Sequence, residues 1–359
     1  MIKVAINGYG RIGRVAHRVI LEKFANEVDV VAINAGLSTD LAGWMYLLKY
    51  DTVYGALENH TVAIKAPESS PLSFQTKAQF LGMLSVDQKD IPIFSDRDPL
   101  NLPWRDLAVD VVIESTGAFT TQEKMQPHIT AGAKSVVLSA PFKDEAASGT
   151  FVLGVNLTND QTGLPNIISN ASCTTNCIAP VAHVMEKTFG ITKAMMTTIH
   201  GFTSDQRLQD GGHKDYRRAR AASLNIIPTS TGATKAAAQA IPSLKGIFNG
   251  LAIRVPVPVG SLSDFTFLVK RQTTVDEVNK ALTDASQTYL KGILETTTEP
   301  LVSSDVIGNP HSSIADLSLT QVVGGDMVKV IAWYDNEFGY ANRLVEETIV
   351  LGKQLSPAA

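Results

Sequence analysis

The 359-residue sequence predicts an α/β fold in which a doubly wound parallel sheet is combined with a second, α+β domain that has a mixed or antiparallel sheet. Three observations lead to this prediction. In the first third of the chain, short apolar runs alternate with helical segments, and a glycine-rich turn joins the first predicted strand to the first predicted helix. From about Ser172 onward, the predicted strands become longer. A chain of this length corresponds to about two domains of roughly 150 residues each.

The first domain is predicted from apolar runs that show no alternation with polar residues. Such runs are typical of strands buried on both faces, as in a parallel sheet covered by helices. The predicted elements are the strands Ile2–Ile6, Val28–Ile33, Val109–Glu114 and Ser135–Ser139, and the helices Arg14–Phe24 and Gln122–Ala131. The stretch Ala66–Phe94 is Pro/Ser-rich at its start, and we expect it to form loop and small antiparallel pieces.

The second domain is predicted from longer strand segments with intervening helices. Its predicted elements are the strands Gly190–Ile199, Leu251–Pro256, Ser263–Lys270 and Met327–Trp333, and the helix Val275–Leu290. The tail Asn342–Lys353 has the pattern of an amphipathic helix. We expect the first domain to span residues 1–171 together with this terminal helix at 337–359, and the second to span 172–336.

The charge balance excludes several classes of partner. Lys and Arg number 31 against 35 Asp and Glu, a net charge of −4, which provides no general attraction for nucleic acid or an anionic membrane surface. No run of 18 apolar residues predicts a transmembrane helix, and the start of the chain has no leader pattern. Two cysteines in so long a chain suggest a reducing compartment. We therefore expect a cytoplasmic protein.

The turn Asn7–Gly13 carries the pattern G-x-G-x-x-G, formed by Gly8, Gly10 and Gly13, between a predicted strand and helix. Glycines there allow a tight turn and a close approach of backbone N–H groups to a pyrophosphate at the helix N-terminus. The competing explanation is a tight turn without a ligand. The surrounding strand–helix–strand pattern favours a dinucleotide site.

The end of the second predicted strand bears on which dinucleotide is bound. An acidic residue is expected there to hold the ribose 2′-hydroxyl of NAD. This chain has Asn34-Ala35, and its next acidic residue is Asp40. The absence of a carboxylate permits the 2′-phosphate of NADP and weakens the case for NAD. No Arg or Lys lies in Asn34–Tyr46, so this segment supplies no cation for that phosphate.

Cys173 and Cys177 lie one helical turn apart in the segment SNASCTTNC, which joins an apolar strand to a helical stretch. At a helix N-terminus the dipole and unpaired N–H groups favour a thiolate at Cys173. His200 ends the next apolar strand, and an ion pair with Cys173 would activate the thiol. The alternatives are two small buried hydrophobic residues, a structural histidine, or half of a zinc site. No further cysteines complete such a site, so we expect no metal, and Cys177 is expected to be structural.

Ordered motifs along the chain resemble those of the phosphorylating glyceraldehyde-3-phosphate dehydrogenase family over essentially its whole length. SNASCTTNCIAP, followed in order by IPTSTG and YDNEFGY, is highly specific. The other matching segments are AINGYGRIGR, LLKYDTVYG, STGAF, SAPFKDE, TTIHGFTSDQR, HKDYRRARAASLN, RVPVP and SSDVIG. The resemblance implies a Rossmann-type cofactor domain, a catalytic domain, an oxidoreductase activity and a homotetramer.

The resemblance also implies roles for single residues. Cys173 would add to the aldehyde as the nucleophile, and His200 would lower the thiol pKa and act as acid and base. Hydride transfer to the nicotinamide would leave a thioester, which inorganic phosphate would convert to 1,3-bisphosphoglycerate. The substrate phosphate would be held by Thr203 and Arg254, and inorganic phosphate by Ser172, Thr174, Arg218, Thr231 and Gly232. The cofactor would be held by Gly8, Gly10, Arg11, Ile12, Asn34, Ala35, Arg97, Thr116, Ser139, Asn336 and Tyr340.

Two departures from the family pattern concern the cofactor. NAD-dependent members usually have Asn-Asp where this chain has Asn34-Ala35, and Leu-Pro where it has Gly211-Gly212. Both departures accompany NADP use in the family, so we expect an enzyme that prefers NADP or accepts both NADP and NAD. Two alternatives remain. Erythrose-4-phosphate dehydrogenase typically lacks the runs found here as His200–Thr203 and Ser230–Gly232, and a non-catalytic binding protein on the same scaffold would usually lose the nucleophile.

Overall fold

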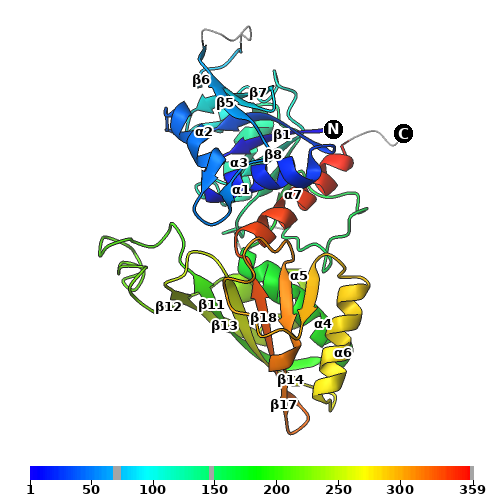
Figure 1. Cartoon of the computed structure of the whole chain (residues 1–359). Helices are drawn as coiled ribbons and strands as arrows, with labels where there is room; N and C mark the ends of the chain where they lie inside the picture. The colour runs from blue at the N-terminus through cyan, green and yellow to red at the C-terminus, as the bar shows by residue number, and fades with distance from the viewer. Residues whose placement is uncertain (68–73, 145–148, 356–359) are drawn as a thin grey trace. The chain divides into compact units, whose positions relative to one another are not determined.

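The computed structural model describes residues 1–67, 74–144 and 149–355, which form two compact units. The first unit contains Met1–Thr150, Asn159–Asn170 and the chain from Ala341 onward, and the second contains Phe151–Thr158 and Ala171–Tyr340. Figure 1 shows the chain leaving the first unit and returning to it at the C-terminal helix.

The segment Phe151–Thr158 lies in the second unit, although the expected boundary placed it in the first. Its packing explains the difference. Leu153 and Leu157 are buried, and Gly154 lies so close to Ile293 and Leu290 that a Cβ atom would come within 2.6 Å of the isoleucine methyl. This short apolar segment precedes Ser172, where the predicted strands become longer. The sequence pattern therefore does not reveal that it packs in the second unit.

The first unit is built on an eight-stranded sheet in the order β10-β9-β8-β1-β2-β7-β6-β5. The strands β1 (Ile2–Asn7), β2 (Val28–Asn34), β8 (Val111–Glu114), β9 (Ser135–Leu138) and β10 (Ile167–Ser169) are parallel. β8 and β9 are buried along their whole length. The predicted doubly wound parallel sheet is confirmed.

The other edge of this sheet is a regular antiparallel extension. The strands β5 (Val62–Lys65), β6 (Gln79–Val86) and β7 (Lys89–Ser95) pair in turn, and β7 also pairs with β2 in parallel. The antiparallel pairing expected here is confirmed, but β6 and β7 are regular strands of eight and seven residues rather than small pieces. Residues 68–73 lie outside the described residues. The two-residue turn Asp87-Gln88 has positive φ angles of 49° and 69°, as tight hairpin turns require, but it lacks the glycine that usually marks such a turn.

Helices and short strands complete the first unit. The helix α1 (Arg11–Val19) follows β1 directly and continues as a π-helical turn (Ile20–Phe24). Side chains of Asp40 and Thr121 cap α2 (Leu41–Lys49) and α3 (Gln122–Thr130) by accepting backbone N–H groups. The short strands β3 (Tyr50–Asp51) and β4 (Gly55–Ala56) pair with each other, and α7 (Phe338–Lys353) lies in this unit from Ala341 onward.

The second unit is built on a mixed sheet in the order β12-β13-β11-β14-β18-β16-β15, with β17 (Gln321–Val323) paired to β18. This confirms the predicted mixed sheet. Its main strands are β11 (Ile191–Gly201), β12 (Ile227–Ser230), β13 (Phe248–Val255), β14 (Ser261–Val269), β15 (Leu294–Thr297), β16 (Ser313–Asp316) and β18 (Met327–Tyr334). β14 alternates strictly between buried and half-buried side chains, so it presents one face to the core.

The helix α4 (Cys173–Phe189) packs on the mixed sheet, against β11, β14, β16 and β18, and beside α5 (Ala233–Ala240) and α6 (Val275–Gln287). Figure 1 shows α4 and α6 beside the strands of this sheet. The Ser172 side chain caps α4 by accepting the N–H of Thr175 at 3.0 Å. The cap sets Cys173 as the first residue of the helix, as the sequence predicts. In the described part of the chain no helix has the length and apolarity to span a membrane.

Candidate active site

Cys173 and His200 come together at the start of α4 and the end of β11. The sulfur atom of Cys173 lies 3.3 Å from Nε2 of His200, within hydrogen-bonding distance. Both residues belong to the second unit, and His200 is buried while Cys173 is partly exposed. The sequence predicts this pair because a cysteine at a helix start is followed, 27 residues later, by a histidine at a strand end. In the structure, α4 packs on the sheet that contains β11, and this brings the two side chains together.

The Nδ1 atom of His200 has two neighbours. It lies 2.7 Å from the carbonyl oxygen of Gly201, which can only accept a hydrogen bond, and 3.0 Å from Nη1 of Arg254, which can only donate one. Arg254 Nη1 also donates to the Gly201 oxygen at 3.1 Å. In the tautomer with the proton on Nδ1, the lone pair of Nε2 faces the thiol, and the imidazole can accept a proton from Cys173.

Burial dominates the acid–base properties of both groups. It raises the pKa of the Cys173 thiol, an effect that the positive charge of Arg254 and the hydrogen bonds of Thr174 partly offset. Burial, reinforced by the charge of Arg254, lowers the pKa of His200 to about 3. These directions favour an uncharged thiol and imidazole over the ion pair that the sequence suggests.

The turn before α4 is held in an unusual conformation. Ala171 has φ of +52°, a region that residues with a Cβ rarely adopt and that stores strain at functional sites. The hydroxyl of Tyr340 donates to the Ala171 carbonyl oxygen at 3.2 Å. Tyr340, expected near the nicotinamide, is therefore buried with its hydroxyl engaged by the turn that precedes Cys173.

Thr203 and Arg254 come together as the first expected anion site. Arg254 Nη1 lies 3.4 Å from Thr203 Oγ1, and its Nε is buried without a hydrogen-bond partner among the described residues. Gln206, which sequence analysis did not single out, accepts the N–H of Thr203 at 3.3 Å, and its buried Nε2 also has no partner there. Buried donors without partners beside a hydroxyl are suited to bind an anion. The adjacent motif TSDQR contains Gln206 and could have signalled it.

The residues of the second expected anion site lie around two adjoining helix starts. Thr175 Oγ1 donates to the carbonyl oxygen of Ala233, which joins the beginning of α4 to that of α5. Ser172 and Thr174 flank Cys173 on α4, and Thr231 and Gly232 directly precede α5. Arg218 is tied to the same region, because its Nη2 donates to the Ser230 oxygen at 3.2 Å. Helix N-termini and guanidinium groups are natural phosphate ligands.

Asp205 is the counter-ion of Arg218. Its Oδ2 accepts from Arg218 Nη1 at 2.6 Å, and Thr229 Oγ1 accepts from Arg218 Nε at 3.0 Å. Sequence analysis did not identify Asp205 or Thr229. Asp215 is a second carboxylate near this guanidinium, with its Oδ2 3.7 Å from Arg218 Nε. An anion at this site would therefore have to compete with Asp205 and Asp215 for Arg218.

Tyr334 is a further residue that sequence analysis did not single out. Its buried hydroxyl lies 3.0 Å from Thr174 Oγ1 and 2.8 Å from Thr198 Oγ1, and its ring meets the His200 ring edge to face. It therefore joins the start of α4 to strand β11 next to the catalytic pair. Tyr334 is the first residue of the motif YDNEFGY, but an aromatic residue that ends an apolar strand looks like ordinary core.

The glycine-rich turn of the first unit fits a dinucleotide. Gly8 has φ of +94°, and a Cβ there would lie 2.6 Å from the backbone nitrogen of Thr116. A Cβ at Gly13 would lie 2.2 Å from the Gly8 carbonyl oxygen, so this glycine allows the helix to pack against the turn. A Cβ at Gly10 would meet nothing within 4 Å. Open space at the start of α1 is what a pyrophosphate requires.

The next two residues of the turn behave differently from each other. Arg11 forms an ion pair with Asp51 and lies over the ring of Tyr54, so its guanidinium is engaged within the first unit. Ile12 is partly buried in the first turn of α1. Only the backbone of Arg11 and Ile12 is thus suited to contact a pyrophosphate here.

A cavity of about 450 Å³ opens at the carboxyl ends of the parallel strands. Its lining residues are Asn7, Asn34, Gly36, Leu37, Asp96, Arg97, Thr116, Ala118 and Phe119. In open α/β sheets, ligands bind at these strand ends. The structure thus brings Asn34, Arg97 and Thr116 together as expected. Asp96 was not singled out by sequence analysis, although it immediately precedes Arg97.

Ser139 and Asn336 end up at separate positions. Ser139 follows β9 in the first unit, where its N–H donates to the Glu114 carbonyl oxygen at 2.9 Å. In the second unit, the side-chain oxygen of Asn336 accepts from Gly260 N at 3.2 Å and Ser261 Oγ at 2.9 Å. The buried amide of Asn336 is thereby oriented, and its Nδ2 has no hydrogen bond to the described residues.

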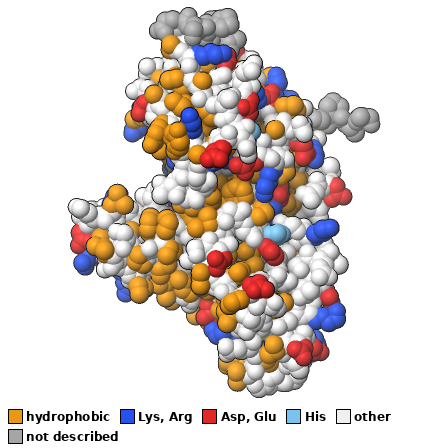
Figure 2. All heavy atoms as spheres, viewed as in Figure 1, with side chains coloured by type: hydrophobic (Ala, Val, Ile, Leu, Met, Phe, Trp, Pro, Cys, Tyr) orange, Lys and Arg blue, Asp and Glu red, His pale blue; other side chains and the backbone are white. Residues whose placement is uncertain are grey.

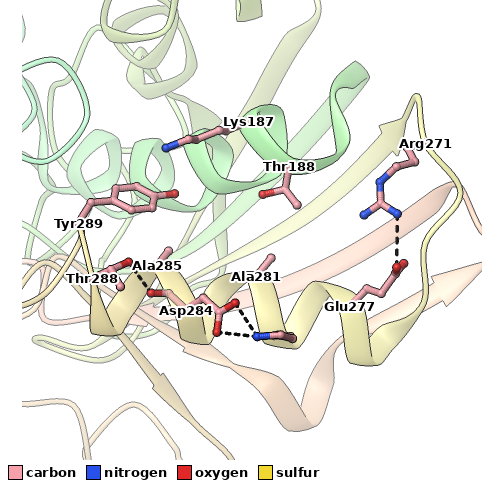
Figure 3. Close-up of a pocket in the computed structure, with 10 residues that line it drawn as sticks. Lys187, Thr188, Arg271, Glu277, Ala281, Asp284, Ala285, Thr288 and Tyr289 are labelled. Atoms are coloured by element: carbon pink, nitrogen blue, oxygen red, sulfur yellow. Dashed lines mark hydrogen bonds and ion pairs between the residues drawn. The ribbon is translucent and has the colours of Figure 1, made fainter.

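A separate hollow of about 480 Å³ lies between α4 and α6 (Figure 3). Its charged groups are paired with each other, Arg271 with Glu277 and Lys280 with Asp284. Lys187 lies over the ring of Tyr289. Because its cations already have partners, this hollow has less to offer a charged ligand than the sites around Cys173.

Comparison with known proteins identifies the family. Residues 2–122 match the family model described as glyceraldehyde 3-phosphate dehydrogenase, NAD binding domain, and residues 172–336 match that of its C-terminal domain. Glyceraldehyde-3-phosphate dehydrogenase 2 of Streptomyces avermitilis is 48% identical over 357 residues, 99% of both chains. The protein of the same name from Trichormus variabilis is 50% identical over 346 residues, 96% of this chain and 97% of the relative.

A third relative, glyceraldehyde-3-phosphate dehydrogenase of Mycobacterium tuberculosis, is 48% identical over 358 residues, 99% of both chains. The similarity thus extends over both units. The chain belongs to the glyceraldehyde-3-phosphate dehydrogenase family and is an NAD(P)-dependent oxidoreductase.

Proposed function

We propose that this enzyme catalyses the reversible oxidative phosphorylation of D-glyceraldehyde 3-phosphate to 1,3-bisphosphoglycerate through a thioester on Cys173. The observation that carries the proposal is the 3.3 Å contact between the Cys173 sulfur and His200 Nε2. This contact lies at a helix N-terminus, with candidate anion ligands around it. Comparing turnover with and without inorganic phosphate tests the proposal, because the thioester pathway requires phosphate for product release.

His200 acts first as a base and then as an acid. Its Nε2 accepts the thiol proton while the sulfur attacks the aldehyde carbon, and the imidazolium then protonates the developing oxyanion to give a thiohemiacetal. The nicotinamide cofactor, when bound, supplies the acceptor for the hydride. His200 removes the hydroxyl proton as the C–H bond breaks, and the carbonyl of the thioester forms.

Phosphate completes the cycle. An oxygen of inorganic phosphate attacks the thioester carbon, the C–S bond breaks, and the acyl phosphate leaves. The Cys173 sulfur departs as a thiolate and recovers a proton from the His200 imidazolium. Two negatively charged groups must be bound, and we assign Thr203 and Arg254 to the substrate phosphate. Ser172, Thr174, Thr231, Gly232 and Arg218 are assigned to inorganic phosphate.

We propose NADP as the preferred cofactor, or both NADP and NAD. Ala35 replaces the carboxylate that would repel a 2′-phosphate. The exposed guanidinium of Arg97 lines the cavity and has no hydrogen bond or ion pair with the described residues, so it can attract that phosphate. Gly211 and Gly212 remain a second argument, taken from the resemblance. Comparing kcat/KM for NADP and NAD tests the preference, and a large preference for NAD would contradict it.

Introducing a carboxylate should reverse this preference. We expect Ala35→Asp to lower the ratio of kcat/KM for NADP to that for NAD by about tenfold or more, because two negative charges then face each other. The matched control is Ala35→Asn, which has the same shape without the charge and should change the ratio much less. An equal shift in both variants would show that size, rather than charge, decides the preference.

Two alternatives are not favoured. Erythrose-4-phosphate dehydrogenase is disfavoured by Thr203, which the structure places beside Arg254 in the segment that this enzyme typically lacks. A non-catalytic binding protein is disfavoured because the nucleophile and base lie within hydrogen-bonding distance. Measuring both sugar phosphates as substrates separates the first alternative, and any phosphate-dependent turnover excludes the second.

We further propose a cytoplasmic homotetramer. Its support is a group of exposed apolar side chains between β11 and β12, where Leu208, Tyr216 and Leu224 are each at least 80% exposed. Exposed patches of this kind mark interaction surfaces, and Figure 2 shows hydrophobic side chains gathered on this part of the second unit. Both cysteines are free thiols, as expected in a reducing compartment. Sedimentation velocity tests the tetramer, and a monomer at assay concentration would contradict it.

A further inference from the structure

We propose that Glu114 is a positioning residue of the cofactor site, which orients side chains at the edge of the cavity without touching the cofactor. This inference rests on the assignment of that cavity to NAD(P). Glu114 ends strand β8 and is completely buried. It lies outside the lining of the cavity, whereas its hydrogen-bond partners Asn7 and Thr116 are part of that lining.

The Glu114 carboxylate is the common acceptor of four hydrogen bonds. Its Oε1 accepts from the backbone nitrogen of Thr116 at 2.9 Å and from the Thr116 hydroxyl. Its Oε2 accepts from Nδ2 of Asn7 at 2.5 Å and from Nε2 of His128 at 3.1 Å. A carboxylate is the side-chain group that accepts on both oxygens and donates on neither, so each of the four donors requires it.

His128 is committed to donate by its second neighbour. The indole Nε1 of Trp104, which can only donate, lies 3.0 Å from Nδ1 of His128. The Nδ1 atom must therefore accept, and the ring proton lies on Nε2, facing Glu114. Trp104 and His128 are both completely buried, so water cannot replace either partner. Trp104 therefore donates to His128, and His128 in turn donates to Glu114.

Asn7 connects Glu114 to Asn34, the last residue of β2, and to the loop that follows it. Because its Nδ2 donates to Glu114, its oxygen must face outward, and it accepts from Asn34 Nδ2 at 2.6 Å. The oxygen of Asn34 is then turned toward backbone donors, and it accepts from Asp96 N at 3.1 Å and Gly36 N at 3.3 Å. Asn34, Gly36 and Asp96 all line the cavity. Asn34 Nδ2 also donates to the Asp96 carbonyl oxygen at 2.9 Å, so the Asp96 backbone holds this amide together with Asn7. Glu114 therefore orients Asn7 directly and, through it, helps to position the loop that carries Ala35.

A glutamine at this position cannot serve the same donors. If the NH2 group is turned toward Asn7 Nδ2 and His128 Nε2, two buried donors are left without an acceptor, and the Asn7 amide loses the interaction that orients it. If it is turned toward Thr116, which is exposed, the backbone nitrogen of Thr116 loses its acceptor. In either orientation, one of the two cavity-lining partners of Glu114 is no longer held.

The test compares Glu114→Gln with Asp110→Asn. Asp110 lies just before the opposite end of β8, where its carboxylate accepts from Lys3 N at 2.9 Å and Lys134 Nζ at 2.7 Å, so its variant matches the chemistry away from the cavity. Titration calorimetry with NADP and with NAD, without substrate, should show a Kd raised by about tenfold or more in Glu114→Gln. Asp110→Asn should bind as the wild type does. At saturating cofactor, kcat of Glu114→Gln should fall less than KM for the cofactor rises.

The outcomes separate this inference from the function it rests on. An unchanged Kd in folded Glu114→Gln, with normal binding by the wild type, would overturn the positioning role alone. A wild type that binds neither dinucleotide would overturn the cofactor assignment and this inference with it. If Glu114→Gln does not fold, Glu114→Asp decides the question. It keeps the charge but is too short to reach both Asn7 and Thr116, so an unchanged Kd in that variant would also refute the proposal.

Discussion

Replacing Cys173 by serine is expected to lower kcat for phosphate-dependent aldehyde oxidation by at least about 10⁴-fold, since a neutral hydroxyl cannot replace the nucleophile. The serine is close in size to the cysteine, and the residues that line the cofactor cavity are unchanged. The Kd for NADP should therefore remain within about twofold of the wild-type value, because no cofactor contact is assigned to the thiol. Steady-state assays combined with calorimetry on the same preparation measure both quantities.

Cys177→Ser is the matched control for this experiment. Cys177 lies one turn further along α4, completely buried, with its sulfur 3.8 Å from Ser263 Oγ and 3.7 Å from Ser313 Oγ. Burial raises the pKa of its thiol to about 12, so it stays protonated. Activity should survive this substitution. If Cys173→Ser kept wild-type activity, or if Cys177→Ser lost it, the assignment of the nucleophile would be wrong.

Replacing His200 by asparagine should lower kcat by about 10²- to 10⁴-fold, the usual contribution of general acid–base catalysis. It should also change the dependence on pH. Burial raises the pKa of the Cys173 thiol, so without a base only the small thiolate fraction reacts. In the variant the acylation rate should rise about tenfold per pH unit up to the thiol pKa.

The wild type should respond less to pH in the same range. Burial lowers the pKa of His200 to about 3, so the imidazole is neutral and able to accept the thiol proton throughout the neutral range. Single-turnover measurements of NADPH formation without phosphate report acylation directly. A parallel rise with pH in both proteins would show that His200 does not act as the base.

The fold could be predicted where local patterns agree with tertiary structure. The strands β1, β2, β8 and β9 are mainly apolar and mainly buried, and the helix α4 begins where Ser172 can cap it. Antiparallel pieces were expected around β6 and β7, but the length of the hairpin was not, because its turn, Asp87-Gln88, has neither glycine nor asparagine to indicate positive φ. That conformation is imposed by pairing of the two strands, which is a tertiary effect.

The site could be predicted where a residue type has few other uses. A cysteine at a helix start and a histidine at a strand end suggested chemistry, and the motifs of the family suggested the anion ligands. Gln206 and Tyr334 lie inside quoted motifs but were not singled out, and Glu114 lies in none of them. Their contacts with Thr203, Thr174 and Asn7 respectively are visible only in the structure.

The same limit applies to the protonation of the catalytic pair. The sequence suggests a Cys173–His200 ion pair, since a helix start and a nearby imidazole both favour a thiolate. The depth of burial, which only the structure reveals, favours the uncharged pair and makes proton transfer part of the attack.

The central claim is that Cys173 becomes acylated and that phosphate then releases the acyl group. The most direct measurement is mass spectrometry of the enzyme quenched after mixing with D-glyceraldehyde 3-phosphate and NADP, without inorganic phosphate. We expect one 3-phosphoglyceryl group on the peptide that contains both cysteines, with fragmentation placing it on Cys173, and its loss when phosphate is added. Absence of the adduct despite NADPH formation, or its location on Cys177, would contradict the account.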